Sequence, residues 1–296
     1  MRGTLPVVPS PPVKLVLEGG GSRAAYAAGV LGPLAEAGLR CEAVVGSSTG
    51  AVNAAYFAAG QMDVVTRIWR EVIPDGFISY RRLLTPGGRP GLDVDRMIDE
   101  VLQRGWSKLD VEAAIADSPA LYAVATEVPS GAPVVARPTA ADIFDWLRAA
   151  VALPVGYNRL VRLGERDLVD GGVASSVPFD EPVATETSAP TVVILTRPME
   201  TEKPAPAWWH RLFLRTIVPP AVRDLTLDQH KRHNLLMRRL AEARERGDVL
   251  VVDPPPEMSL RRLTRDRAAI ADGIAIGEQV GQALAARLVQ AQTPSS

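Results

Sequence analysis

Cysteine and histidine are scarce in this sequence, and both scarcities limit its chemistry. A single Cys among 296 residues excludes a disulfide framework and any zinc site built on cysteines. The three histidines, His210, His230 and His233, all lie in the last third of the chain. Apart from the Asp228–His233 cluster, no His pair stands at ligand spacing from an acidic residue, and no calcium-loop pattern appears. We therefore expect no metal and no cofactor.

The sequence also lacks an excess of one charge, a long apolar run and a signal peptide. Its 33 Lys and Arg balance 34 Asp and Glu, which argues against a nucleic-acid-binding protein. No apolar run reaches the roughly 18 residues that a membrane-spanning helix needs. Residues 1–12 hold four Pro and no apolar signal-peptide core, so they predict a disordered lead-in and a cytoplasmic protein.

Strand-like and helix-like patterns alternate from the start of the chain. Apolar residues 13–17 predict a strand, which is followed by glycines and by a helix over 22–37. A second apolar run, at 43–45, leads into a small-residue helix over 49–59. We expect Gly38 and Gly60 to end these two helices. The alternation predicts a βαβ unit with parallel strands.

The remaining patterns extend this plan to the C-terminus. They predict strands over 121–128, 133–137, 160–169 (a hairpin), 191–196 and 249–253. They predict helices over 93–103, 140–151, 207–246 (broken at Pro219-Pro220) and 268–289. The polar, Pro-rich residues 197–206 predict a linker. We expect a three-layer α/β/α fold with a mostly parallel central sheet. Its core would span residues 13–196, and residues 197–296 would form a helical extension packed on that core.

The strongest local motif is Gly46-Ser47-Ser48-Thr49-Gly50, a G-x-S-x-G sequence at a predicted strand-to-helix turn. A Ser on such a sharp turn is forced outward, and the flanking Gly46 and Gly50 relieve crowding. At a helix N-terminus the Ser also gains free backbone N–H groups and a dipole that favours developing negative charge. The alternative is a plain small-residue turn, but the context favours Ser48 as a nucleophile.

Three consecutive glycines, Gly19, Gly20 and Gly21, lie between the first strand and its helix. Their N–H groups could converge on a phosphate or an oxyanion. A dinucleotide-binding loop is the weaker interpretation, because Ala24 stands where the third glycine belongs and no acidic residue closes the second strand. Arg23 either anchors an anionic group or is a solvated residue in the first helical turn.

A third motif, Asp170-Gly171-Gly172, places a carboxylate on a tight turn at a strand end. Alone it is a common turn sequence. Together, the G-G-G-x-R loop, the G-x-S-x-G turn and the late D-G-G resemble the patatin-like phospholipase family, in the family's order and over roughly residues 13–196. Residues 149–179 resemble the family's A-S-x-x-x-P…D-G-G-x-x-x-x-x-P pattern.

The resemblance implies a serine acyl-ester hydrolase of phospholipase A, lysophospholipase or esterase type, acting on lipids through a Ser–Asp dyad and an acyl-enzyme. By match, Ser48 would be the nucleophile and Asp170 the base. The Gly19–Gly21 loop and the Thr49 N–H would hold the oxyanion, and Arg23 would be the family's basic loop residue. Thr49 departs from the family, which favours Ala there, and its branched side chain could change rate or substrate.

Two other interpretations stay open. A Ser–His–Asp triad is formally available, but the three histidines lie in an Arg-rich helical region and His230 and His233 predict a solvated helix face. In a dyad, by contrast, Asp170 takes the Ser48 proton directly, so burial would have to raise its pKa from about 4. The other alternative is a catalytically weak lipid- or membrane-binding protein on the same fold.

Residues 207–218 alternate bulky apolar side chains, including Trp208 and Trp209, with arginines, and residues 203–239 hold eight basic and two acidic side chains. This pattern is typical of an interfacial membrane helix, which would make the protein peripheral at a membrane; the alternative is a helix packed on the core. We expect a lipid or fatty-acyl ester as substrate and no nucleic-acid partner. Head group, acyl length, positional preference and oligomeric state stay open.

Overall fold

A central sheet of eight strands organises the computed structural model, which describes residues 12–75, 77–83, 90–181 and 189–290. The strand order is β5-β6-β3-β2-β1-β7-β8, and β4 pairs with β3 outside this path. The five strands from β3 to β8 in that order are parallel, whereas β4, β5 and β6 pair antiparallel. The strands are β1 (Val13–Leu17), β2 (Cys41–Ser47), β3 (Ala120–Val128), β4 (Pro133–Ala136), β5 (Val161–Leu163), β6 (Arg166–Asp170), β7 (Thr191–Ile194) and β8 (Val249–Val252).

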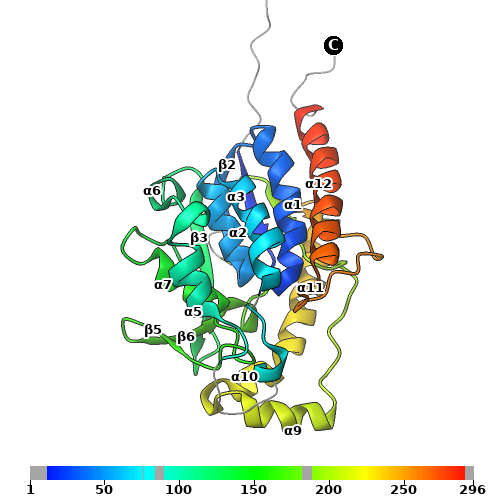
Figure 1. The fold of residues 1–296 in the computed structure, drawn as a ribbon. Helices are drawn as coiled ribbons and strands as arrows, with labels where there is room; N and C mark the ends of the chain where they lie inside the picture. Colours follow the sequence, from blue (N-terminus) through cyan, green and yellow to red (C-terminus); the bar gives the residue numbers. More distant parts are fainter. Residues whose placement is uncertain (1–11, 76, 84–89, 182–188, 291–296) are drawn as a thin grey trace, which may run out of the picture.

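Helices cover both faces of this sheet (Figure 1). Side chains alternate along a strand, so Leu15 and Leu17 enter one hydrophobic core while Val16 enters another. The first core is closed by α1 (Ala24–Glu36), α2 (Thr49–Ala58), α7 (Ile143–Val151) and α12 (Arg267–Gln290), and the second by α11 (Gln229–Glu245). The predicted three-layer fold with a mostly parallel sheet is confirmed.

The two helices after β1 and β2 end at the predicted glycines. Gly38 and Gly60 have positive φ angles of 70° and 68°, which glycine adopts without strain. The expected helix over 93–103 is α5 (Val94–Arg96) continued by a π-helical turn, Met97–Val101. The expected helical stretch over 207–246 is divided into α9 (Trp208–Ile217), α10 (Arg223–Leu227) and α11. Shorter helices are α3 (Met62–Arg67), α4 (Tyr80–Leu83), α6 (Val111–Ala114) and the 3-10 turn η1 (Gly21–Arg23).

The C-terminal third is built into the same sheet and helix layer. Strand β8 pairs in parallel with β7, and α12 packs along α1. The backbones of α1 and α12 approach so closely that a Cβ on Gly29 would lie 2.3 Å from the Ile274 carbonyl oxygen. Within the described residues, the part of the chain after residue 196 thus adds a strand to the central sheet and a helix to the layer that α1 belongs to. The expected lead-in, residues 1–12, lies outside the described residues except for Pro12.

Candidate active site

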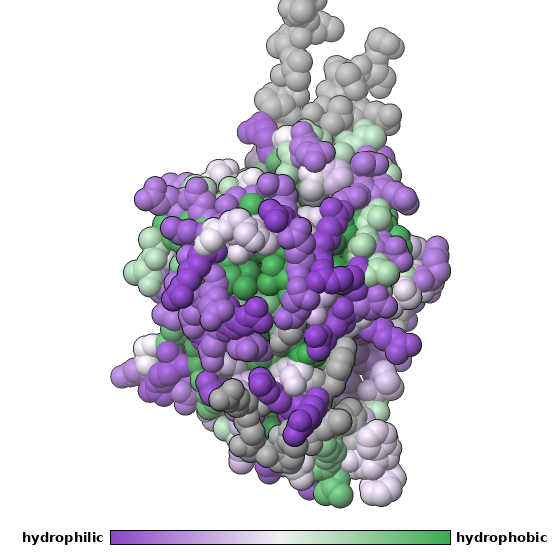
Figure 2. Space-filling view, in the orientation of Figure 1, coloured by the Kyte–Doolittle hydropathy of each residue, from purple (hydrophilic) through white to green (hydrophobic). Residues whose placement is uncertain are grey.

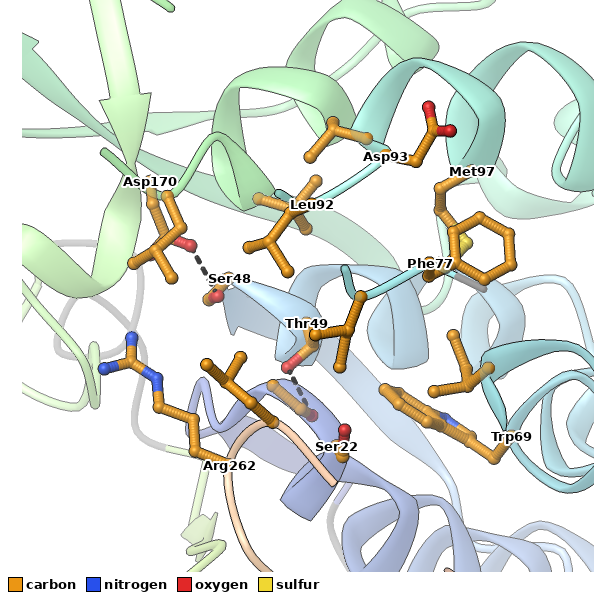
Figure 3. A pocket seen from close by; sticks show the side chains of 17 residues that line it. Ser22, Ser48, Thr49, Trp69, Phe77, Leu92, Asp93, Met97, Asp170 and Arg262 are labelled. Atoms are coloured by element: carbon orange, nitrogen blue, oxygen red, sulfur yellow. Dashed lines mark hydrogen bonds between the residues drawn. The ribbon is translucent and has the colours of Figure 1, made fainter. Parts of the chain in front are cut away.

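Ser48 lies at the sharp turn between β2 and α2. Its φ of 52° and ψ of −133° are a strained conformation for a residue with a side chain. The glycines of the motif make room for the turn, since a Cβ on Gly46 would lie 2.4 Å from the Gly50 carbonyl oxygen and one on Gly50 would lie 2.6 Å from that of Leu17. The turn directs the Ser48 side chain into a pocket (Figure 3).

Asp170 ends β6 and lies beside Ser48, although 122 residues separate them in the chain. Strand β3 brings them together, because Ser47 pairs with Val124 on one side of it and Asp170 pairs with Ala125 on the other. The Ser48 hydroxyl donates a 2.6 Å hydrogen bond to Oδ2 of Asp170. The other carboxylate oxygen, Oδ1, accepts one of 2.7 Å from the N–H of Gly172, the second glycine after it.

The Asp170 carboxylate is almost completely buried, with 1% of its surface exposed. Burial raises its pKa, while the hydrogen bond from Ser48, the positive charge of Arg262 and the Gly172 N–H act in the opposite direction. A carboxylate with a raised pKa that already accepts a hydrogen bond from the hydroxyl has the arrangement that direct proton transfer requires.

The glycine loop offers fewer free donors than its sequence predicts. The Gly19 N–H donates to the Ser176 carbonyl at 3.1 Å, so Gly19 is not available to an oxyanion, contrary to our expectation. The Gly20 N–H donates to the Thr49 hydroxyl, which in turn donates to the Gly21 carbonyl, both at 3.2 Å. Within the described residues, the N–H groups of Gly21 and Thr49 form no hydrogen bond, which leaves them as the two unengaged donors.

Arg23 fits neither role that the sequence suggested. It does not line the pocket, and it lies half-buried near the fully buried Glu18. Burial lowers the Arg23 pKa to about 10. Glu18 accepts hydrogen bonds from the N–H (2.6 Å) and hydroxyl (2.9 Å) of Thr196, and one of its oxygens lies 3.5 Å from Nε of Arg197. Sequence patterns gave no indication of this buried charged group next to the loop.

The pocket has one polar and one apolar side (Figure 3). Ser48, Thr49 and Asp170 lie at its centre, and Arg262 stands apart from the apolar wall. That wall is formed by Trp69, Ile73, Phe77, Ile78, Leu92, Val94, Met97, Val151 and Leu153. Most of these residues come from the weakly patterned middle of the chain. The sequence patterns did not point to Arg262 as a site residue. Its only signal in the sequence is a cluster of arginines over 261–267.

The described histidine side chains make no contact with the Ser48–Asp170 pair. His233 is buried, which corrects the expected solvated face, and its Nδ1 lies 2.8 Å from the Ser176 hydroxyl. Burial and the nearby cations Lys203 and Arg197 lower its pKa to about 2, so it stays neutral. His230 bonds to the carbonyl of its own helical neighbour Leu227 at 2.9 Å. The side chain of His210 lies outside the described part of the chain.

The described residues offer neither a metal cluster nor a membrane-spanning helix. No group of three or more His, Cys, Asp or Glu side chains gathers there closely enough to hold a metal ion. None of the helices in these same ranges combines the length and the hydropathy needed to cross a bilayer.

Two curated proteins are similar to this chain over part of their length. The chain is 28% identical over 203 residues to the uncharacterized protein YjjU of Escherichia coli, covering 68% of this chain and 56% of that protein. It is 31% identical over 179 residues to an uncharacterized NTE family protein of Mycobacterium tuberculosis, covering 55% of this chain and 27% of that protein. The chain thus spans about half, or less, of the length of these relatives.

The fold has a solved counterpart. The crystal structure of VipD from Legionella pneumophila superposes with a TM-score of 0.50 at 12% identity, over 94% of this chain and 67% of that one. The sequence model of the patatin-like phospholipases matches residues 15–183, which include all three motifs and more than half of the chain. The chain therefore belongs to the patatin-like phospholipase family.

Proposed function

We propose that this protein is a serine acyl-ester hydrolase that acts on lipids, with Ser48 as nucleophile and Asp170 as its base. The observation that carries the proposal is the 2.6 Å hydrogen bond from the Ser48 hydroxyl to a buried carboxylate with a raised pKa. Hydrogen-bond contact between a nucleophile and its base characterises covalent catalysis of this kind. Family membership supports the same reaction class.

In the first half-reaction, Ser48 Oγ attacks the ester carbonyl carbon and Asp170 accepts the hydroxyl proton. The carbonyl oxygen becomes an oxyanion, which the N–H groups of Gly21 and Thr49 and the N-terminus of α2 stabilise. When the carbon–oxygen bond to the alcohol breaks, Asp170 gives its proton to the departing oxygen. In the second half-reaction, water attacks the acyl-Ser48 ester, Asp170 again takes and returns a proton, and the fatty acid leaves.

The pocket wall supports an acyl chain as the group that Ser48 receives. Trp69, Phe77 and Met97 are among the mainly apolar side chains beside Ser48, and the carboxylate of Asp93 also lines the pocket on this side (Figure 3). A mainly apolar surface favours a hydrocarbon chain because each buried CH₂ contributes about 0.8 kcal/mol. We therefore propose a lipid ester, such as a phospholipid or lysophospholipid, as the substrate.

We further propose that α9 holds the enzyme at a membrane surface. One side of α9 packs on the body, since Leu214 and the following Val218 are buried, while Trp208 and Leu212 are 78% and 61% exposed. The exposed arginines Arg211 and Arg215 flank this outer side. Together they form an amphipathic, basic surface of the kind that inserts into the head-group region of a bilayer.

The position of α9 suits delivery of a lipid to the pocket. It lies at the lower end of Figure 1, below α10. Figure 2 shows pale and hydrophobic surface over α9 at this end. Leu214 and Val218 share a hydrophobic cluster with Val169 and Val173, which lie on either side of the Asp170-Gly171-Gly172 turn, so we propose that a bilayer contacting α9 lies near the pocket.

Hydrolysis of a short-chain nitrophenyl ester tests the reaction. We expect Ser48→Ala and Asp170→Asn each to lower kcat by about 1,000-fold or more. Asp167→Asn on the same strand is the matched control, because Asp167 is partly exposed and pairs with Arg162. Full activity in Asp170→Asn would exclude the dyad and direct attention to the histidines.

A fluorophosphonate probe separates the enzyme from a lipid-binding protein on the same fold. The probe should label Ser48 in the wild type and not in Ser48→Ala. Lipid binding without any adduct on Ser48 would favour the binding protein.

A further inference from the structure

The polar side of the pocket carries a positive charge that the proposed reaction does not use. Arg262 lies in the segment between β8 and α12, and Figure 3 shows its guanidinium turned toward the Ser48–Asp170 pair from the side opposite Trp69 and Phe77. In the part of the chain that the structure describes, this guanidinium forms no hydrogen bond and no ion pair. A cation on the polar side of the pocket that has no direct ion-pair partner favours binding of an anion.

The backbone of residue 262 is fixed to the glycine loop. The Ser22 N–H donates to the Arg262 carbonyl and the Ser22 hydroxyl donates to the Thr264 carbonyl, both at 2.8 Å. Gly21, at a φ of 57°, lies so close that a Cβ there would stand 2.3 Å from the Arg262 carbonyl oxygen. This segment and the oxyanion donors therefore form one unit, so the Arg262 side chain starts from a fixed point relative to Ser48.

The charges around Arg262 leave the area short of negative charge. Lys203, Arg197 and Arg23 lie close enough for mutual repulsion, and burial together with Arg197 and Arg262 lowers the Lys203 pKa to about 6. The carboxylates of Glu18 and Asp170 also act electrostatically on Arg262, but neither pairs with it directly. Glu18 accepts from Thr196 and lies 3.5 Å from Arg197, and Asp170 accepts from Ser48 and Gly172. With its pKa of about 6, Lys203 is largely uncharged at neutral pH, so Arg23, Arg197 and Arg262 face the two carboxylates Glu18 and Asp170. An incoming anion would offset the remaining positive charge.

We propose that Arg262 binds the phosphate group of a glycerophospholipid or lysophospholipid and selects such esters over uncharged ones. The proposal rests on the proposed function and assigns one part of the substrate to each side of the pocket. With the acyl chain along the apolar wall and the ester carbonyl at Ser48, the alcohol side of the substrate points toward Arg262. In a glycerolipid only the glycerol carbons separate ester and phosphate, and a guanidinium matches two phosphate oxygens at once.

Arg262 could instead act on the reaction only through Asp170, whose pKa it lowers. That effect would be the same for every ester, whereas phosphate binding acts on phosphate-bearing esters alone. Two substrates with the same acyl chain and the same glycerol separate the roles: 1-oleoylglycerol, which is neutral, and 1-oleoylglycerol 3-phosphate.

The first measurement is kcat/KM for both substrates. We expect Arg262→Gln to lower the ratio of phosphate to neutral substrate by about tenfold or more, mainly through KM, because a charge-assisted hydrogen bond contributes roughly 1.5–3 kcal/mol. Arg262→Lys should restore part of the ratio. Arg261→Gln removes the same charge from an exposed neighbour outside the pocket and should leave the ratio unchanged. Equal losses on both substrates, or an unchanged ratio in Arg262→Gln, would overturn the proposal.

The second measurement needs no turnover. Affinity for 1-oleoylglycerol 3-phosphate is measured by calorimetry with Ser48→Ala and with Ser48→Ala/Arg262→Gln. We expect the double variant to bind about tenfold or more weakly, and equal affinity of the two proteins would contradict phosphate binding by Arg262. Absence of hydrolysis in the wild type would instead count against the proposed function, so the two failures are distinguishable.

Discussion

The Thr49 hydroxyl accepts a 3.2 Å hydrogen bond from the N–H of Gly20, so the residue after the candidate nucleophile engages one of the expected oxyanion donors. The same hydroxyl donates to the Gly21 carbonyl and thereby ties the start of α2 to the glycine loop. Thr49 thus has a second effect besides the crowding that its branched side chain suggests.

Replacing Thr49 tests which effect limits the rate. We expect Thr49→Ala to raise kcat several-fold, because it frees the Gly20 N–H and an oxyanion donor contributes about 100-fold or more when fully used. Thr49→Val is the matched variant, since it keeps the branch and lacks the hydroxyl. A gain in both variants identifies the hydrogen bond, and a gain in Ala alone identifies crowding. A loss in both would show that the hydroxyl itself supports the oxyanion.

The activity should depend on the protonation of Asp170. Only the ionised carboxylate can accept the Ser48 proton, so kcat/KM falls as pH decreases through the Asp170 pKa. Because burial raises that pKa, the fall should lie above the ordinary aspartate value of about 4. Arg262 lowers the same pKa, so Arg262→Gln should move the fall to higher pH. The profile is measured on a neutral ester, and a shift to lower pH in Arg262→Gln would contradict this assignment.

Stability should change with pH in the corresponding direction. A carboxyl whose pKa is raised in the folded protein binds its proton more tightly there than in the unfolded chain. The free energy of unfolding of the wild type therefore decreases as pH rises through the folded-state pKa of Asp170. Asp170→Asn lacks this decrease, so its stability relative to the wild type should increase with pH and then level off. Urea unfolding of both proteins at several pH values measures the difference, and a constant difference would contradict the raised pKa.

The membrane contact of α9 can be tested by sedimentation with anionic phosphatidylglycerol vesicles. We expect Trp208→Ala/Leu212→Ala to weaken vesicle binding about tenfold or more, because each side chain contributes roughly 1.5–3 kcal/mol when it leaves water. Trp106→Ala is the matched control, since Trp106 is 45% exposed but lies on a different element, next to Arg67. Unchanged binding in the α9 variant, with an unchanged melting temperature, would exclude this surface.

Short stretches of sequence were enough to predict the elements that frame the site. The apolar run before Gly19, the motif around Ser48 and the helix ends at Gly38 and Gly60 all depend on local periodicity and on glycine's freedom at positive φ. These properties act over a few neighbouring residues, so the fold class and the βαβ start followed from the sequence.

Local pattern could not predict which distant groups meet. Gly19 is unavailable because its N–H faces Ser176, and His233 is neutral because it is buried beside cations. Arg262 reaches the pocket because its segment binds the glycine loop through Ser22. Each of these facts depends on packing between residues at least 30 positions apart.

What the sequence alone determined is therefore the order of strands and helices, the strained serine turn and the family to which three motifs point. Only the tertiary structure decided which distant residues lie next to those motifs. Strand β3 pairs with Ser47 on one side and Asp170 on the other, which places the carboxylate against the Ser48 hydroxyl. Strand pairing and burial set distances and pKa values, and both are properties of the assembled sheet and not of any single segment.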